Sequence, residues 1–269
     1  MDLVWRLEDV NASRPETPFI VTFGGGVNSA AVLVGLSKLN ICPDLITFAD
    51  TGGEKPETYS FIETMQHWCE SVGFPQITIV RTIGVRTGDT SLEDACRRLE
   101  VMPRRTVGLG TCALRWKIEP QVKHLKKWSP YKIAAAAGLK PFKTIGYDAD
   151  EERRAKVSED DLCKYVFPLI EWGWTREDCL KALTEAGLPR PIKSACFYCP
   201  SSTKSEVLEL AKTHPLLFQR AVEMERGALK SGKMHSVKGL GRHWSWEALV
   251  AAPEAEHITC INLKVFATV

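Results

Sequence analysis

The sequence predicts an α/β fold with a doubly wound, mainly parallel sheet and a helical C-terminal portion. Three apolar, β-rich runs, at residues 18–23, 44–50 and 76–82, alternate with segments of helical pattern. Strand, helix and strand at this spacing are typical of parallel sheets with crossover helices. The first two runs end at the glycines of 24–26 and 52–53, which suit a chain leaving the edge of a sheet.

The connecting elements follow in order. Helical pattern extends from Asn28 to about Leu39, and a second helix begins after Pro56. Residues 84–110 are polar and rich in turn residues, which predicts a mobile loop or short helices. Further helices are predicted at 113–128, 131–137, 175–186, 204–212 and 215–230, and further strands at 142–147 and 257–266. This pattern suggests an α/β domain over 1–170 and a mainly helical region over 171–269.

Composition indicates a soluble globular protein. Of the 269 residues, 44% are hydrophobic and 25% are charged, and the net charge of +2 does not by itself indicate nucleic-acid binding. The basic clusters at 97–98, 104–105, 123–127 and 153–154 suit either a polyanion or solvated helix faces. No run approaches the roughly 20 apolar residues of a membrane span, and no signal-peptide core is present. We therefore expect a cytoplasmic location and no membrane partner.

Three glycines, Gly24, Gly25 and Gly26, lie between the first predicted strand and its helix. Glycine tolerates a positive φ and lets backbone N–H groups converge on an anion, toward which the helix also points its partially positive N-terminus. The hydroxyl of Ser29 could add a donor. The loop is neither a Walker A loop nor a G-x-G-x-x-G fingerprint. On its own it suits a tight turn as well as it suits a phosphate site.

Several segments carry a family resemblance. VTFGGGVNSA resembles the PP-loop, usually S-G-G-x-D-S, of the adenine-nucleotide α-hydrolase superfamily, whose sheet is Rossmann-like. FADTGGEKPETY, RWKIEP, IGYDADEERR and PLIEWGWTREDCLKALTEAGL resemble segments of its phosphoadenosine phosphosulfate reductase-like family, and SACFYCP resembles the cysteine pair of the phage-type branch. The resemblance implies binding of ATP, or a related adenine nucleotide, with Mg²⁺. Asn28 stands where the loop is usually acidic, and Phe23 or Gly24 stands where its first serine is usual.

We expect the nucleotide site to combine this loop with the ends of two strands. Asp50 ends the second predicted strand, where open α/β sheets bind ligands, although an Asp there also suits a turn. The resemblance assigns phosphate or sulfate contacts to the region of Arg153, whose planar fork suits them, and catalytic roles are predicted for Lys117 and Arg153. The predicted nucleotide-binding residues are Phe23, Gly24, Gly25, Gly26, Asn28, Ser29, Asp50, Thr51, Gly146, Asp148 and Arg153.

The nine cysteines include one close pair, Cys196 and Cys199, in a C-x-x-C spacing. Such a pair suits an iron–sulfur cluster, zinc or a redox dithiol. Cys112, in another segment of the family, is the expected third ligand. By resemblance to tRNA-thiolation enzymes, three cysteines would hold a [4Fe–4S] cluster with one open iron, with zinc as the lesser alternative. The other six cysteines are expected to be ordinary buried thiols.

The resulting hypothesis is an ATP-dependent enzyme that adenylates an acceptor, releases pyrophosphate and transfers sulfur to a nucleic acid or nucleotide. Its expected partners are an adenine nucleotide, an RNA or DNA acceptor and a sulfur or electron donor protein, and it could form a homodimer. One alternative is a phosphoadenosine phosphosulfate or adenylyl sulfate reductase, for which Cys260 would be the tail thiol. Another is a nucleotide-binding regulatory module without turnover.

Overall fold

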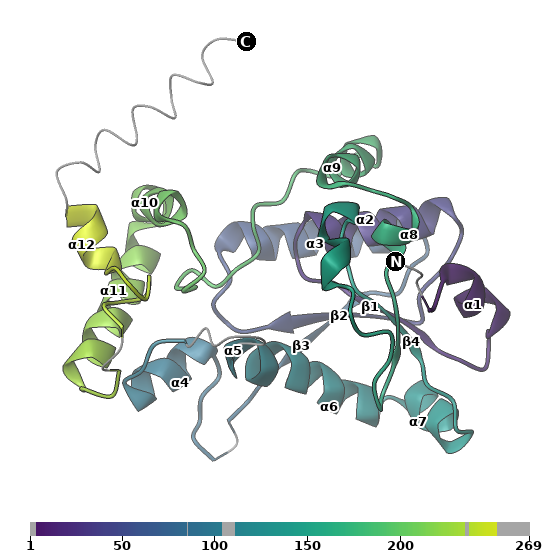
Figure 1. Ribbon diagram of the computed structural model, residues 1–269, viewed down its shortest axis with the longest axis horizontal. Helices are drawn as coiled ribbons and strands as arrows, with labels where there is room; N and C mark the ends of the chain where they lie inside the picture. Colours follow the sequence, from purple (N-terminus) through teal and green to yellow (C-terminus); the bar gives the residue numbers. More distant parts are fainter. Residues whose placement is uncertain (1–3, 85, 104–110, 235–236, 252–269) are drawn as a thin grey trace, which may run out of the picture. The chain divides into compact units, whose positions relative to one another are not determined.

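The computed structural model describes residues 4–84, 86–103, 111–234 and 237–251. These residues pack as two compact units (Figure 1). The first unit comprises residues 1–50, 54–81 and 118–194, and the second comprises 51–53, 82–117 and 195–269, each as far as it is described. The region predicted to be a separate helical part, 171–269, therefore contributes to both units.

The first unit is built on a five-stranded parallel sheet, which confirms the predicted fold class. Its strands lie in the order β3-β2-β1-β4-β5 and every neighbouring pair is parallel. In the central pairs Val21 lies opposite Ile46, and Phe19 lies opposite Phe142. The strands are β1 (Phe19–Thr22), β2 (Leu45–Asp50), β3 (Ile77–Arg81), β4 (Phe142–Thr144) and β5 (Lys164–Val166).

Helices cover both faces of this sheet, as a parallel sheet requires. Figure 1 shows α2 and α3 above the strands and α6 below them. Along β1 the side chains alternate: Phe19 and Val21 join the larger core, whereas Ile20 packs with Leu125 of α6. The helices of this unit are α1 (Leu7–Ala12), α2 (Val27–Lys38), α3 (Pro56–Ser71), α6 (Glu119–Lys127), α7 (Ser129–Ala136), the 3₁₀ helix η2 (Ala149–Arg154), α8 (Pro168–Glu171) and α9 (Arg176–Glu185).

The second unit is helical and has its own core. Its largest buried side chains include Trp246 and Tyr198, which pack with Trp116 and Met224. Its elements are α4 (Leu92–Leu99), α5 (Thr111–Ala113), most of the π-helix η1 (Leu114–Ile118), α10 (Lys204–Thr213), α11 (Pro215–Lys230) and α12 (Trp246–Ala251).

Most predicted elements are present, with two differences. The helix expected over 113–128 is divided into α5, η1 and α6; Pro120, which has no N–H to donate, lies in the first turn of α6. The short elements α1, η2, β5 and α8 were not predicted, because three to six residues are too few for a clear periodicity. Within 84–110, α4 is a short helix as allowed for, and the strand expected at 257–266 lies outside the described residues.

Candidate functional site

The chain changes its direction of winding across the sheet between β1 and β4. From β1 the chain passes through α2 to β2 on one side, and from β4 it passes through η2 to β5 on the other side. Loops that diverge in this way at the carboxyl ends of neighbouring strands form the usual ligand site of an open α/β sheet. Two predicted groups lie there: Gly24–Gly26 after β1, and Gly146–Asp148 after β4.

The turn after β1 depends on Gly25. This residue has a φ of 74°, and a Cβ atom on it would lie 3.2 Å from side-chain atoms of Phe48, Thr58 and Ser194. Glycine is therefore required both by the backbone conformation and by the space. The neighbouring Phe23 side chain is buried in the core against Phe48, so Phe23 can contribute to the loop only through its backbone.

The N-terminus of α2 presents backbone donors at this turn. Gly26 precedes the helix in an extended conformation and offers no side-chain cap. The first helical N–H that bonds back into the turn is that of Ala30, to the oxygen of Gly26 at 3.1 Å. The three preceding N–H groups and the helix dipole therefore favour an anion at this end. The Ser29 hydroxyl donates to the same Gly26 oxygen at 3.0 Å.

The loop after β4 lies directly against the first turn of α2. A Cβ on Gly146 would lie 3.4 Å from the backbone nitrogen of Ser29. Beyond it, Asp148 is buried and accepts a hydrogen bond on Oδ2 from Asn28 Nδ2 at 2.9 Å. The Oδ1 atom of Asp148 is buried without a hydrogen-bond partner among the residues described. A buried carboxylate oxygen without a partner is costly, and it marks a place where a ligand group would bond.

A residue that the sequence analysis did not select completes this cluster. Arg176, the first residue of α9, donates from Nη1 to Asn28 Oδ1 at 2.5 Å. It lies there because α9 packs along α2 in the same direction. Arg176 meets Asn28 at the starts of the two helices, and Lys38 pairs with Glu185 at their ends. Arg176 and Asn28 are 148 positions apart in the chain, so only this packing brings them together. In its own segment, WTREDC, the one local signal at Arg176 is that it follows the helix cap Thr175.

Asp50 and Thr51 lie in different units although they are neighbours in sequence. The buried Asp50 carboxylate accepts from the Tyr59 hydroxyl at 2.9 Å and from Arg81 Nε at 2.8 Å. Burial, and then the adjacent Asp50 charge, raise the pKa of Tyr59, so Tyr59 remains a donor. Thr51 belongs to the second unit, where its Oγ1 lies 3.0 Å from Cys196 Sγ.

The two predicted catalytic residues lie in different units. Arg153 is exposed on η2, while the neighbouring Arg154 lies over the Tyr147 ring, 4.2 Å from its centroid, and pairs with Glu151. Lys117 is half-buried on η1 in the second unit. Their roles stay predictions.

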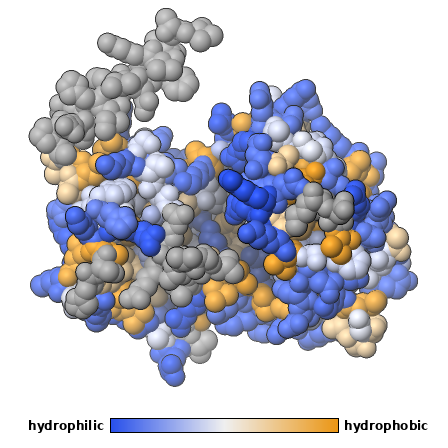
Figure 2. Space-filling view, viewed as in Figure 1, coloured by the Kyte–Doolittle hydropathy of each residue, from blue (hydrophilic) through white to orange (hydrophobic). Residues whose placement is uncertain are grey.

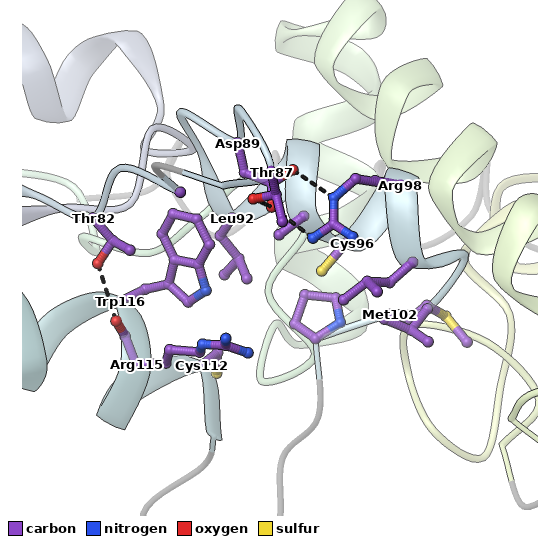
Figure 3. A pocket seen from close by; sticks show the side chains of 15 residues that line it. Thr82, Thr87, Asp89, Leu92, Cys96, Arg98, Met102, Cys112, Arg115 and Trp116 are labelled. Atoms are coloured by element: carbon purple, nitrogen blue, oxygen red, sulfur yellow. Dashed lines mark hydrogen bonds and ion pairs between the residues drawn. The ribbon is translucent and has the colours of Figure 1, made fainter.

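The second unit contains a cavity of about 230 Å³ between α4 and the α5–η1 segment (Figure 3). Cys96, Cys112, Trp116 and two arginines are among its lining residues. Of these arginines, Arg98 forms two hydrogen bonds with Asp89, at 2.9 and 2.7 Å. These bonds are the main reason why the pKa of Asp89 falls to about 2.

The predicted cysteine ligands share one apolar cluster. Cys196 and Cys199 lie in one turn, in which the Cys199 N–H donates to the Cys196 oxygen at 2.9 Å. Cys196 is buried in this cluster, and Cys112 and Cys199 are partly buried against it. Cys96 joins them: burial, followed by the nearby Cys112 and Cys196, raises its pKa to about 12. No motif surrounds Cys96, so the sequence predicted only an ordinary buried thiol there.

The arrangement of these thiols does not fit a metal ion as it stands. Among the residues that the structure describes, no three His, Cys, Asp or Glu side chains come together so as to hold one. Thiols are the right kind of ligand for zinc or an iron–sulfur cluster, but here one of them contacts a hydroxyl instead. The assignment of Cys112, Cys196 and Cys199 to a metal therefore stays a prediction.

No described helix has both the length and the hydrophobicity that a membrane span needs. On the face shown in Figure 2, hydrophobic residues lie scattered among hydrophilic ones.

Comparison with known proteins gives a distant likeness of fold. No protein-family model matches the chain, and neither does any curated protein. A phosphoadenylyl-sulfate reductase from Candida auris, in complex with phosphate, is 18% identical with a TM-score of 0.44, over 69% of this chain and 79% of that one. The U34-tRNA thiolase NcsA from Methanococcus maripaludis, with its [4Fe-4S] cluster, is 17% identical with a TM-score of 0.44, over 82% of this chain and 74% of that one. Both neighbours are enzymes, and the likeness leaves the activity of this chain open.

Proposed function

We propose that this chain is an ATP-dependent enzyme that adenylates an acceptor and releases pyrophosphate. The observation that supports the proposal is the meeting of the Gly25 turn, the start of α2 and the buried Asp148. The backbone N–H groups at the start of α2 would bind phosphate oxygens, and the unpartnered oxygen of Asp148 in the described structure would accept from a hydroxyl group or bind the metal ion of the nucleotide. The choice of ATP rests on the resemblance of the loop to a PP-loop.

The reaction needs orientation and charge stabilisation rather than a nucleophile from the protein. An oxygen of the acceptor attacks the α-phosphorus and forms a new P–O bond. The bond from that phosphorus to the bridging oxygen breaks, and pyrophosphate leaves with the electron pair. Backbone N–H groups of the loop would bind the departing phosphates, where negative charge accumulates, and Mg²⁺ bound with the nucleotide would share that charge.

The decisive measurement is pyrophosphate release from ATP and Mg²⁺, with RNA, DNA and small nucleotides supplied in turn as acceptors. Asp148→Asn removes the charge of the buried carboxylate with little change of shape, and Asp150→Asn is the matched control at an exposed position two residues away. We expect at least a tenfold loss of release for the first variant, roughly the effect of losing a charged ligand contact, and no loss for the control.

Two results would redirect the proposal. Nucleotide binding without release with any acceptor would favour a regulatory module. Sulfite formation from phosphoadenosine phosphosulfate would favour a reductase.

Sulfur transfer is the finer part of the proposal and depends on the thiols of the second unit. Among the described residues those thiols do not form a metal-binding group, and the adenylation step above does not depend on one. Iron, zinc and acid-labile sulfide should be measured in anaerobically purified protein. Cys69, a buried thiol of α3, is the control position. Loss of metal in Cys196→Ser but not in Cys69→Ser would support the predicted ligands. Unaltered protein that contains no metal would contradict the predicted ligand role of the three cysteines.

A further inference from the structure

We infer that Arg176 binds the phosphates of the nucleotide and that Asn28 positions it. The inference rests on the proposed nucleotide site and assigns that site a cation that the sequence analysis placed elsewhere, at Arg153.

The loop needs a cation from outside its own segment. No Lys or Arg occurs between residues 15 and 37, so the glycine turn and the first turn of α2 have only backbone dipoles and hydroxyls to offer a phosphate. The next cation along the chain, Lys38, lies at the far end of α2 and pairs with Glu185 at 2.8 Å. Arg176 is the cationic side chain seen to contact the start of α2 among the described residues.

The guanidinium of Arg176 is exposed and only partly used. One of its nitrogens, Nη1, donates to Asn28. The planar fork has five N–H groups, and those that remain can form paired bonds with phosphate oxygens. The neutral amide of Asn28 holds the arginine in place and leaves its positive charge available. A carboxylate in the same place would neutralise that charge.

The identity of residue 28 follows from its two neighbours. Its Nδ2 faces the Asp148 carboxylate, and its Oδ1 faces the Arg176 guanidinium, which has no acceptor to offer. An aspartate at position 28 would suit Arg176, but it would bring two carboxylates together at Asp148, where the present contact is 2.9 Å. Asn28 therefore suits both neighbours, whereas the acidic residue usual at this place in the loop would face the Asp148 carboxylate.

A ligand is also indicated independently of the arginine. The Asp148 side chain is 4% exposed, and its Oδ1 is buried without a partner in the described structure, beside the oxygen that accepts from Asn28. An oxygen in this state is suited to accept from a donor, or to bind a cation, of a bound molecule. The cluster of Asn28, Asp148 and Arg176 thus presents an acceptor and a cation at one end of α2.

Calorimetric titration of the full chain with ATP, inorganic pyrophosphate and adenosine tests the inference. Arg176→Ala should weaken ATP and pyrophosphate about tenfold or more, as for loss of a charge-assisted pair of hydrogen bonds. Adenosine, which has no phosphate, should bind as to the unaltered chain. Arg176→Lys should fall between the two, since it keeps the charge and loses the fork. Lys181→Ala, which removes an exposed cation of the same helix, is the matched control and should bind all three ligands unchanged.

The positioning role of Asn28 is tested by a double-mutant cycle. Asn28→Ala alone should weaken pyrophosphate binding. In the Arg176→Ala background the same substitution should cause little further loss of affinity, because the arginine that Asn28 positions is gone. Additive losses would overturn the positioning role. Equal binding of pyrophosphate by Arg176→Ala and by the unaltered chain would overturn the whole inference while leaving the nucleotide site intact. If the unaltered chain binds neither ATP nor pyrophosphate, the proposed function fails with it.

Discussion

At the scale of single residues, the glycine loop contains positions of unequal importance. Gly25 has both a positive φ and close neighbours, whereas a Cβ on Gly24 would meet only the Ser29 hydroxyl at 3.6 Å. Three identical letters in the sequence thus have different structural roles. The backbone of Gly25 sets the direction in which the chain leaves β1 and enters α2.

Gly25→Ala should therefore destabilise the first unit by about 1–2 kcal/mol, the usual cost of a left-handed conformation for an L-residue, with further cost from the 3.2 Å contacts. Gly24→Ala should cost less than about 0.5 kcal/mol. Urea unfolding of the two variants measures the difference. Equal stabilities would show that the turn does not need its positive φ.

At the scale of elements, a buried carboxylate of α11 anchors the start of α12. Glu225 of α11 is buried and accepts hydrogen bonds from the N–H groups of Leu240 and Trp246, at 2.6 and 3.1 Å, and from the Ser245 hydroxyl at 2.5 Å. A six-residue helix has little stability of its own. The Glu225 carboxylate accepts from the first-turn donors of α12, complements the dipole of that helix and holds the helix against α11.

Glu225→Gln keeps the size of the side chain but turns part of the acceptor into a donor that faces other donors. It should lower the free energy of unfolding of the second unit by about 2 kcal/mol. Glu223→Gln, at an exposed position of the same helix, should lower it by less than about 0.5 kcal/mol. Amide hydrogen exchange should speed up in 238–251 for Glu225→Gln alone. Unchanged exchange there would mean that hydrophobic packing is enough to hold α12.

At the scale of the whole molecule, ionised carboxyls link stability to pH in both units. A hydrogen bond from a neighbouring side chain is the largest cause of a lowered pKa at four of them: Asp89 with Arg98, Asp178 with Thr175, Glu185 with Lys38, and Glu247 with Arg226. Each pKa is lower in the folded chain than in the unfolded one. The stabilisation is therefore complete above the unfolded pKa, near 4, and is lost as the pH falls through the folded value.

Urea midpoints should consequently stay level at neutral pH and fall between about pH 4 and pH 2, the range set by the shift of Asp89. Asp89→Asn should be less stable than the unaltered chain at neutral pH, with a difference that shrinks at acid pH. A difference that does not depend on pH would show that Asp89 is not ionised in the folded chain.

The pattern of apolar runs and glycines was enough to predict four of the five strands, the helices that connect them and the loop at the end of β1. These features are local, since the period of the hydrophobic residues and the conformational freedom of glycine act within a few positions. The same reasoning indicated Asp148, which lies just beyond a predicted strand. It could not tell Asp148 from Asp50, because only the structure pairs Asp50 with Arg81 and leaves one oxygen of Asp148 unpartnered.

The sequence by itself therefore determined the α/β class, the glycine turn and the ends of the strands near which a ligand would bind. Only the tertiary structure decided which side chains meet there. Arg176 reaches Asn28 through the packing of α9 on α2, and Cys96 reaches Cys112 and Cys196 through the core of the second unit. Contacts between residues so far apart in the chain depend on how elements pack, and no local pattern records that packing.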